Sequence, residues 1–123
     1  MPNVLIIDDS ATTRMFYRAT LEAAGFEVDE AANGLEGLEK TMLAPFDLVI
    51  VDVNMPKMDG FSFVRLLRRS AEAASVPALI ITTEAGAEDF RQGRLAGANF
   101  YLVKPVAQTE LVRHVSVLTG AAM

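Results

Sequence analysis

The chain has 123 residues, of which 51% are hydrophobic and 22% charged, a composition typical of one globular domain and not of a disordered protein. Its formal net charge of -5, without any basic stripe, argues against direct nucleic-acid binding. The lack of cysteine excludes disulfides, thiolate metal sites and thiol catalysis, and no apolar run approaches the roughly 18 residues that a membrane span needs.

A strand pattern begins within a few residues of Met1, which leaves no room for a signal peptide, so we expect a cytoplasmic protein without membrane insertion. No linker and no second composition zone follow the last helical pattern. Residues 1–123 are therefore expected to form one stand-alone domain.

The first predicted strand is Val4–Ile7, a continuous apolar run of the kind that is buried on both faces of a sheet. Ser10 is a plausible N-cap for the following helix, and Gly25 ends it. Helical spacing predicts an inward face for this helix that consists of Met15, Phe16, Ala19 and Ala23.

Phe26–Ala31 reads as a more exposed strand at an edge of the sheet, because acidic residues interrupt it. Asn33 and Gly34 open a second helix, and Pro45 stops it. Phe46–Val51 is the predicted central strand. The inward face expected for the second helix consists of Leu35, Leu38 and Met42.

Asp59 caps a third helix whose expected core residues are Phe63, Val64 and Leu67. Pro77–Ile81 and Phe100–Val103 are the fourth and fifth predicted strands. The last helix is predicted over Gln108–Leu118, with an inward face of Leu111, Val115 and Leu118. Among the aromatic residues, Phe46, Phe63 and Phe100 are expected in the core.

Residues 83–99 carry a weaker pattern, punctuated by Gly86, Gly93 and Gly97. Because a glycine inside a helix costs about 1 kcal/mol relative to alanine, a fourth helix here is expected to be short and marginal. Its inward face would consist of Ala87, Phe90 and Leu95. The segment is either a poor helix or an element kept loose because it moves.

Strands that alternate with helices predict a parallel sheet covered by helices on both faces. Right-handed crossovers and units of this length favour a flavodoxin-like three-layer α/β sandwich with five helices and five parallel strands in the order 2-1-3-4-5.

Polar side chains follow four of the predicted strands. Asp8 and Asp9 come after the first strand, Asp52 after the third, Thr82 after the fourth and Lys104 after the fifth. Strand ends of a parallel sheet lie on one edge, where ligands bind. Three carboxylates there would repel one another, and a hard divalent cation removes that penalty.

We therefore predict a Mg²⁺ site, which Mn²⁺ could also occupy, with Asp9 and Asp52 as direct ligands and Asp8 acting mostly through water. The backbone carbonyl of Asn54 could complete the coordination shell. The alternative interpretation is that these aspartates are only helix caps and loop charges.

Asp52 could also act as a nucleophile and form an aspartyl-phosphate. Lys104 would supply positive charge at the phosphoryl oxygens, and the Thr82 hydroxyl would donate a hydrogen bond to one of them. No His or Glu is placed as an obvious base for rapid water attack, and the single histidine, His114, is expected on the surface of the last helix. The phosphoryl group is therefore expected to persist for a time.

Together these residues resemble the receiver domain of two-component response regulators, in particular the CheY-like, chemotaxis-type single-domain regulators. The matching segments, which extend over essentially the whole chain, are Asp8-Asp9-Ser10, Asp52-Val53-Asn54-Met55-Pro56 with Asp59-Gly60, Thr82, and Tyr101-Leu102-Val103-Lys104-Pro105. Any single segment is a weak signal, whereas the combination is specific.

The resemblance implies that Asp52 accepts a phosphoryl group from the phosphohistidine of a sensor histidine kinase or phosphotransfer protein. Thr82 would then move toward the phosphoryl group and Tyr101 would turn inward. A downstream protein would bind the face of the fourth helix, fifth strand and last helix. Lys104–Pro105 resembles the family's cis peptide.

Asn54 and Glu84, each two residues after a site residue, are expected to tune the lifetime of the phosphoryl group. The pathway stays open: the chain could act in chemotaxis or motility, or serve as a relay or phosphate sink. Two other functions compete. A Mg²⁺-dependent aspartyl-phosphate phosphatase would need an acid/base Asp where Asn54 stands, and a flavin or nucleotide binder would need a glycine-rich phosphate loop after the first strand.

Overall fold

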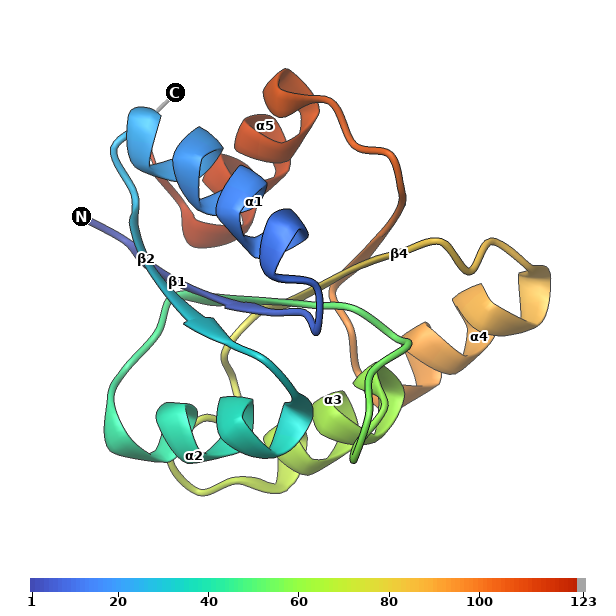
Figure 1. Ribbon diagram of the computed structural model, residues 1–123. Helices are drawn as coiled ribbons and strands as arrows, with labels where there is room; N and C mark the ends of the chain where they lie inside the picture. The colour runs from blue at the N-terminus through green and yellow to red at the C-terminus, as the bar shows by residue number, and fades with distance from the viewer. Residues whose placement is uncertain (122–123) are drawn as a thin grey trace.

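The computed structural model describes residues 1–121, in which five strands alternate with five helices as predicted (Figure 1). In chain order the elements are β1 Asn3–Ile7, α1 Ala11–Ala23, β2 Glu27–Ala31, α2 Gly34–Leu43, β3 Leu48–Val51, α3 Gly60–Arg69, β4 Ala78–Thr82, α4 Ala87–Ala96, β5 Phe100–Val103 and α5 Gln108–Thr119. Within these residues, no helix combines the length and hydropathy that crossing a bilayer would require.

The strands form one parallel sheet in the order β2-β1-β3-β4-β5, which confirms the predicted flavodoxin-like topology. β3 is central, and β2 is an edge strand, as its acidic residues indicated. The register pairs Ile7 with Val51 and Thr82 with Val103, so β1 and β3, like β4 and β5, end side by side. All carboxyl ends therefore lie at one edge of the sheet.

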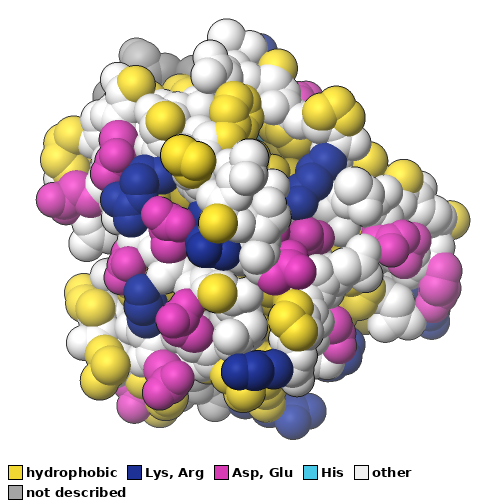
Figure 2. Space-filling model, in the orientation of Figure 1, with side chains coloured by type: hydrophobic (Ala, Val, Ile, Leu, Met, Phe, Trp, Pro, Cys, Tyr) yellow, Lys and Arg dark blue, Asp and Glu magenta, His cyan; other side chains and the backbone are white. Residues whose placement is uncertain are grey.

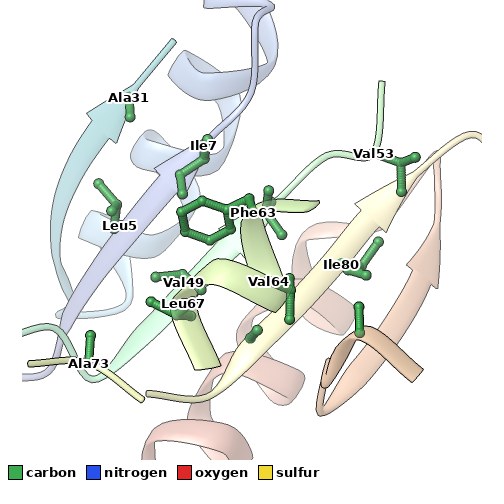
Figure 3. Packing of buried hydrophobic residues seen from close by; sticks show 13 residues of the cluster. Leu5, Ile7, Ala31, Val49, Val53, Phe63, Val64, Leu67, Ala73 and Ile80 are labelled. Atoms are coloured by element: carbon green, nitrogen blue, oxygen red, sulfur yellow. The ribbon is translucent and has the colours of Figure 1, made fainter. Parts of the chain in front are cut away.

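Helices cover both faces of the sheet, with α1 and α5 on one side and α2, α3 and α4 on the other (Figure 1). Figure 3 shows the second of these interfaces, where Phe63, Val64 and Leu67 of α3 lie against the strands. All three are fully buried, as the sequence predicted. The core on the opposite face includes Tyr17 and Leu21 of α1 and Leu111 and Val115 of α5.

Three helices turn a different face inward from the one predicted. In α1 the buried residues are Tyr17, Thr20 and Leu21, whereas Met15 is 63% exposed. In α2 the buried residues are Gly34, Gly37 and Thr41; of the three predicted residues only Leu38 packs against the core, whereas Leu35 and Met42 are exposed. In α4 the buried residues are Gly93 and Ala96, and this helix is ten residues long, as long as α2 and α3, not the short element expected.

The reason is that α2 and α4 approach the sheet through small residues. A Cβ at Gly37 would lie 2.6 Å from Cδ1 of Ile7, and a Cβ at Gly93 would lie 3.0 Å from the ring of Tyr101. Larger apolar side chains of α4 face solvent instead: Phe90 is 40% exposed and Leu95 is 62% exposed.

The prediction that Phe100 belongs to the core is also wrong, because β5 is an edge strand and this side chain is 45% exposed. Its ring packs against the imidazole of His114, with the ring centroids 4.8 Å apart. Phe46 is half-buried against the core.

Side-chain caps fix the starts of three helices, as the sequence indicated. Ser10, Asn33 and Asp59 each accept a hydrogen bond from a backbone N–H in the first turn of α1, α2 and α3, respectively. Each cap ends a loop that leaves the carboxyl edge of the sheet, so these bonds also hold the loops that surround the candidate site.

Candidate functional site

The sheet itself places the predicted site residues, because its hydrogen bonds continue one residue beyond the strands. The N–H of Asp8 donates to Ala31 O (3.1 Å), that of Asp52 to Ile7 O (3.1 Å), and that of Lys104 to Thr82 O (2.8 Å). These backbone bonds bring the three charged side chains to the same edge of the sheet.

Carboxylate oxygens of Asp8, Asp9 and Asp52 lie within 4.8 Å of one another. Asp8 is only 2% exposed and Asp52 only 8%, whereas Asp9 is exposed. An all-oxygen donor set with two buried carboxylates and one open to solvent suits a hard divalent cation that keeps part of its water shell, as Mg²⁺ does. The residues present therefore fit the predicted ion.

Lys104 links the two buried carboxylates. Its Nζ lies 3.1 Å from Oδ2 of Asp8 and 3.0 Å from Oδ2 of Asp52. Burial of the ammonium acts to lower the pKa of Lys104, but the hydrogen bonds and charges of Asp52 and Asp8 outweigh it, so the pKa is raised and the side chain stays charged.

Burial is the largest influence on the pKa of Asp8. It raises the pKa of this carboxyl above its ordinary value, although the hydrogen bonds from the Ser10 backbone and from Lys104 act in the opposite direction. A nearby cation stabilises the charged form of a buried carboxylate. The burial of Asp8 therefore favours binding of a cation over leaving the carboxylate unpaired.

The two carboxylate oxygens of Asp52 have different partners. Oδ1 accepts a hydrogen bond from the N–H of Val53 (2.7 Å), and Oδ2 faces Lys104. The turn after Asp52 packs tightly against the start of α3, because a Cβ at Gly60 would lie 2.2 Å from the carbonyl oxygen of Asp52. Gly60 also donates its N–H to Val53 O (2.9 Å), which fixes the backbone around Asp52.

Thr82 is fully buried beside the site, and its Oγ1 accepts a hydrogen bond from the N–H of Glu84 (3.4 Å). The side chain of Asn54 donates to Oε1 of Glu84 (2.9 Å), which brings the two predicted lifetime-tuning residues into direct contact. Asn54 is exposed in the turn after Asp52. The role of its backbone carbonyl as a metal ligand stays a prediction.

Tyr101 lies behind this loop. Its hydroxyl donates to Glu84 O (2.7 Å), and its ring meets that of Phe90 edge to face, with centroids 4.7 Å apart. Burial, followed by the charges of Asp89 and Glu84, raises the pKa of its hydroxyl to about 12, so the hydroxyl remains a donor. The peptide bond between Lys104 and Pro105 is cis.

Arg14, which was not among the predicted site residues, contacts the site from the second turn of α1. Its Nη1 donates to the carbonyl oxygen of Asp8 (2.5 Å), and its Nε donates to Oε1 of Glu30 on β2 (2.9 Å). The signal that could have revealed it is its position four residues after the N-cap, where a helical side chain leans back toward the helix start. His114 lies on α5 beside Phe100 and is not among the residues gathered at this edge.

The family model described as "Response regulator receiver domain" matches residues 4–116. A relative with the name Protein PilH, from Pseudomonas aeruginosa, is 36% identical over 121 residues, which cover 98% of this chain and all of PilH. Other curated relatives are much longer, and the chain spans only between 10% and 50% of their length.

Two solved structures of receiver-type proteins have folds closely similar to that of this chain. The chemotaxis protein CheY4 of Vibrio cholerae is 41% identical, with a TM-score of 0.91 over 96% of this chain and 98% of CheY4. The receiver domain of a sensor histidine kinase from Pseudomonas aeruginosa PAO1, described with a magnesium ion coordinated in its active site cleft, is 27% identical, with a TM-score of 0.90 over 98% of each chain.

Proposed function

Because this chain belongs to the response regulator receiver domain family of two-component systems, we propose that it is a phosphorylation-controlled switch whose phosphoacceptor is Asp52. The observation that supports the proposal most strongly is the Lys104 ammonium, which lies between the buried carboxylates of Asp8 and Asp52 at the carboxyl edge of the sheet. Asp52 is the central one of these groups, since it follows the central strand.

In the proposed transfer, a carboxylate oxygen of Asp52 attacks the phosphorus of a phosphohistidine on a sensor kinase or phosphotransfer protein. The O–P bond forms as the P–N bond breaks, and the histidine nitrogen keeps the electron pair, so the ring, protonated on its other nitrogen, departs as neutral imidazole. The product is an aspartyl-phosphate, and the proposed activity of the chain is limited to its own phosphorylation and dephosphorylation.

The chain's own groups orient this reaction. The N–H of Val53 holds Oδ1 of Asp52, which leaves Oδ2, the atom beside Lys104, as the attacking oxygen. Lys104 would then neutralise charge on the transferred group, and the Thr82 hydroxyl would donate a hydrogen bond to it. Asp8, Asp9 and Asp52 would hold Mg²⁺, which when bound supplies positive charge at the phosphoryl oxygens.

The switch would depend on the loop between β4 and α4. Thr82 and Tyr101 both hydrogen-bond to Glu84, through its N–H and its carbonyl oxygen respectively. If Thr82 turns toward the phosphoryl group, the bond to Glu84 N–H is lost and the loop that holds the Tyr101 hydroxyl shifts. The face of α4, β5 and α5 would change and bind a downstream protein.

Similarity to the chemotaxis protein CheY4 supports a role in chemotaxis or motility control in the cytoplasm, with a relay or phosphate-sink role as the alternative. The contact between Asn54 and Glu84 supports a shared effect on the lifetime of the phosphoryl group. Substituting both with Ala should change the dephosphorylation rate, and an unchanged rate would remove this part of the proposal.

The test is intact mass spectrometry after incubation with Mg²⁺ and acetyl phosphate or phosphoramidate. We expect the parent to gain one phosphoryl group and Asp52→Asn to gain none. The matched control is Asp47→Asn, an exposed carboxylate just before β3, which should be phosphorylated like the parent. A parent that gains no mass, or an Asp52→Asn variant that does, would refute the assignment. Turnover of p-nitrophenyl phosphate would instead support the phosphatase alternative.

A further inference from the structure

An apolar strip runs along the outer faces of α2 and α3, from the N-terminal turn of α2 to its C-terminal end. On α2 it contains Leu35, which is 47% exposed, and Met42, which is 53% exposed; on α3 it contains Leu66, which is 40% exposed. Leu43 at the end of α2 is 85% exposed. We name these four residues the α2–α3 strip.

Helical geometry places these side chains on facing flanks of the two helices. In α2, Lys40 contacts Asp29 of β2, so Leu35 and Met42, on the opposite flank, lie toward α3. In α3, Arg68 donates to Gly97 O beyond α4, so Leu66, on the opposite flank, lies toward α2. The ring of Phe63 reaches close to Gly37 beneath the strip, which shows that the helices are in contact.

Charges of opposite sign border the strip on its two sides. Exposed Glu39 lies on the outer surface of α2, and exposed Arg65 and Arg69 lie on that of α3. In Figure 2 the lower edge of the molecule, where α2 and α3 lie, shows hydrophobic and acidic side chains toward the left and basic side chains toward the right. Within residues 1–121, neither Glu39 nor Arg69 takes part in an ion pair.

This surface is complementary to itself. α2 and α3 each connect two parallel strands of the sheet, so the two helices run in about the same direction. A two-fold axis along the strip would therefore lay the acidic α2 of one copy over the basic α3 of another, with the apolar residues buried between them. We propose that the α2–α3 strip is a docking surface for a second copy of this chain, held by Leu35, Met42 and Leu66 and oriented by Glu39 against Arg65 and Arg69.

The dimer would use the outer faces of α2 and α3 and none of the residues of the proposed phosphorylation site. It leaves the face of α4, β5 and α5 free, so a dimer could still bind two downstream molecules. Because its charges are exposed, its association should weaken as salt rises. These properties distinguish it from any pairing through the output face.

The test is sedimentation velocity from about 10 µM to about 1 mM protein, the range in which weak specific association becomes visible. We expect reversible dimerisation of the unphosphorylated parent. Glu39→Arg and the double variant Arg65→Glu, Arg69→Glu should each weaken it about tenfold or more, because each places like charges across both symmetry-related contacts.

An equimolar mixture of the two variants is the decisive measurement. In a mixed dimer every reversed charge meets its opposite, so association should return to the level of the parent although each variant alone dimerises more weakly. Arg113→Glu on α5, an exposed reversal on the other face of the molecule, is the control and should dimerise like the parent.

Three results would overturn the proposal: a parent that stays monomeric at about 1 mM, variants that dimerise normally, or a mixture that fails to restore association. A monomeric parent would mean that the α2–α3 strip does not bind a second copy of this chain and that any partner there is a different protein. Phosphorylation by acetyl phosphate, measured on the same variants, should be unchanged and reports that they are folded.

Discussion

At the scale of single residues, the three carboxylates of the site differ in their exposure to solvent. Asp9 is open to solvent, whereas Asp8 is 98% buried and its pKa is raised by that burial. A raised pKa means that the folded protein keeps the proton at a pH where the unfolded chain has lost it. The contribution of Asp8 to stability is therefore complete below its unfolded pKa of 3.8 and is lost as pH rises through the folded pKa.

Removing this charge should stabilise the metal-free protein. Asp8→Asn keeps a side chain of the same shape, and we expect the free energy of unfolding to rise by about 1 kcal/mol near neutral pH. The gain should shrink as pH falls toward 3.8, where the parent carboxyl becomes neutral. Urea denaturation in EDTA measures it. Asp47→Asn, an exposed control, should change stability by less than about 0.5 kcal/mol. A less stable Asp8→Asn protein at neutral pH would contradict the prediction.

Arg14 acts on the site through the backbone of Asp8 and is a positioning residue. Arg14→Met removes this donor but keeps an unbranched side chain. Losing the positive charge could favour cation binding, but Glu30 already pairs with the guanidinium, so the loss of positioning should be larger. We expect Mg²⁺ affinity to fall about tenfold, the usual effect of losing an outer-shell partner. Calorimetric titration of the unphosphorylated protein measures it directly.

The matched control for Arg14 is Arg18→Met. Arg18 also pairs with Glu30, at 2.6 Å, but does not contact Asp8. Its loss should leave Mg²⁺ affinity unchanged. Equal effects of the two substitutions would mean that the charge network of α1 and β2, and not the contact with Asp8, sets the affinity.

At the scale of elements, α4 and β5 meet at a glycine. A Cβ at Gly93 would lie 3.0 Å from Cδ2 of Tyr101 and 3.3 Å from Cδ1 of Ile80. Helix propensity favours Ala over Gly by about 1 kcal/mol, but overpacking costs about 1–3 kcal/mol, and the Tyr101 ring is held by both Glu84 and Phe90. Gly93→Ala should therefore destabilise the protein by about 1 kcal/mol and change the near-ultraviolet signal of tyrosine.

Gly34→Ala is the matched control for this packing. The three atoms nearest to its Cβ, at 3.0–3.1 Å, all belong to the Met58 side chain, which is unbranched and can move. Urea denaturation should find this variant as stable as the parent or slightly more stable. If Gly93→Ala were equally well tolerated, the contact between α4 and Tyr101 would be looser than the structure indicates.

The same glycines explain how far the sequence could predict these elements. Strand order, helix caps and the inward faces of α3 and α5 follow from local patterns, because large apolar residues there coincide with the contact face. In α2 and α4 the fully buried residues are Gly, Ala and Thr, and Leu38 packs beside them, while Leu35, Met42, Phe90 and Leu95 lie outside. A hydrophobic pattern finds the apolar side of a helix, which here is not the packed side.

The candidate site was more predictable than the helix faces because parallel strands place their ends together. Asp8, Asp52, Thr82 and Lys104 could be grouped from their positions after apolar runs. The bond from Arg14 to the Asp8 carbonyl could not, because it depends on how α1 tilts over β1 and on Glu30 of β2, thirty residues into the chain.

At the scale of the whole molecule, cation binding and folding are linked. The clustered carboxylates come from β1 and β3, which lie together only in the folded sheet, so Mg²⁺ should stabilise the native state. At about ten times its dissociation constant, the ion should add about 1.4 kcal/mol, or about 4–8 °C in the melting temperature of a small domain. Thermal melts with Mg²⁺ and with NaCl at equal ionic strength measure the difference.

The control for this linkage is Asp9→Asn, which removes the exposed ligand and leaves the buried pair with Lys104 in place. Its melting temperature should respond much less to Mg²⁺. A parent whose melting temperature is the same in Mg²⁺ and in NaCl would show that the cluster does not select a divalent ion.

Lys104 competes with any added cation for the carboxylate oxygens of Asp8 and Asp52. Its ammonium already contacts the oxygens of Asp8 and Asp52, and its backbone is tied to Thr82, so its local concentration at those oxygens cannot be diluted away. A single positive charge from solution gains little by displacing it. A divalent ion would gain more, and a phosphoryl group on Asp52 would offer the displaced ammonium a new anionic partner. If the proposed function holds, cation binding and phosphorylation should therefore each favour the other, and the site would respond most strongly when both are present.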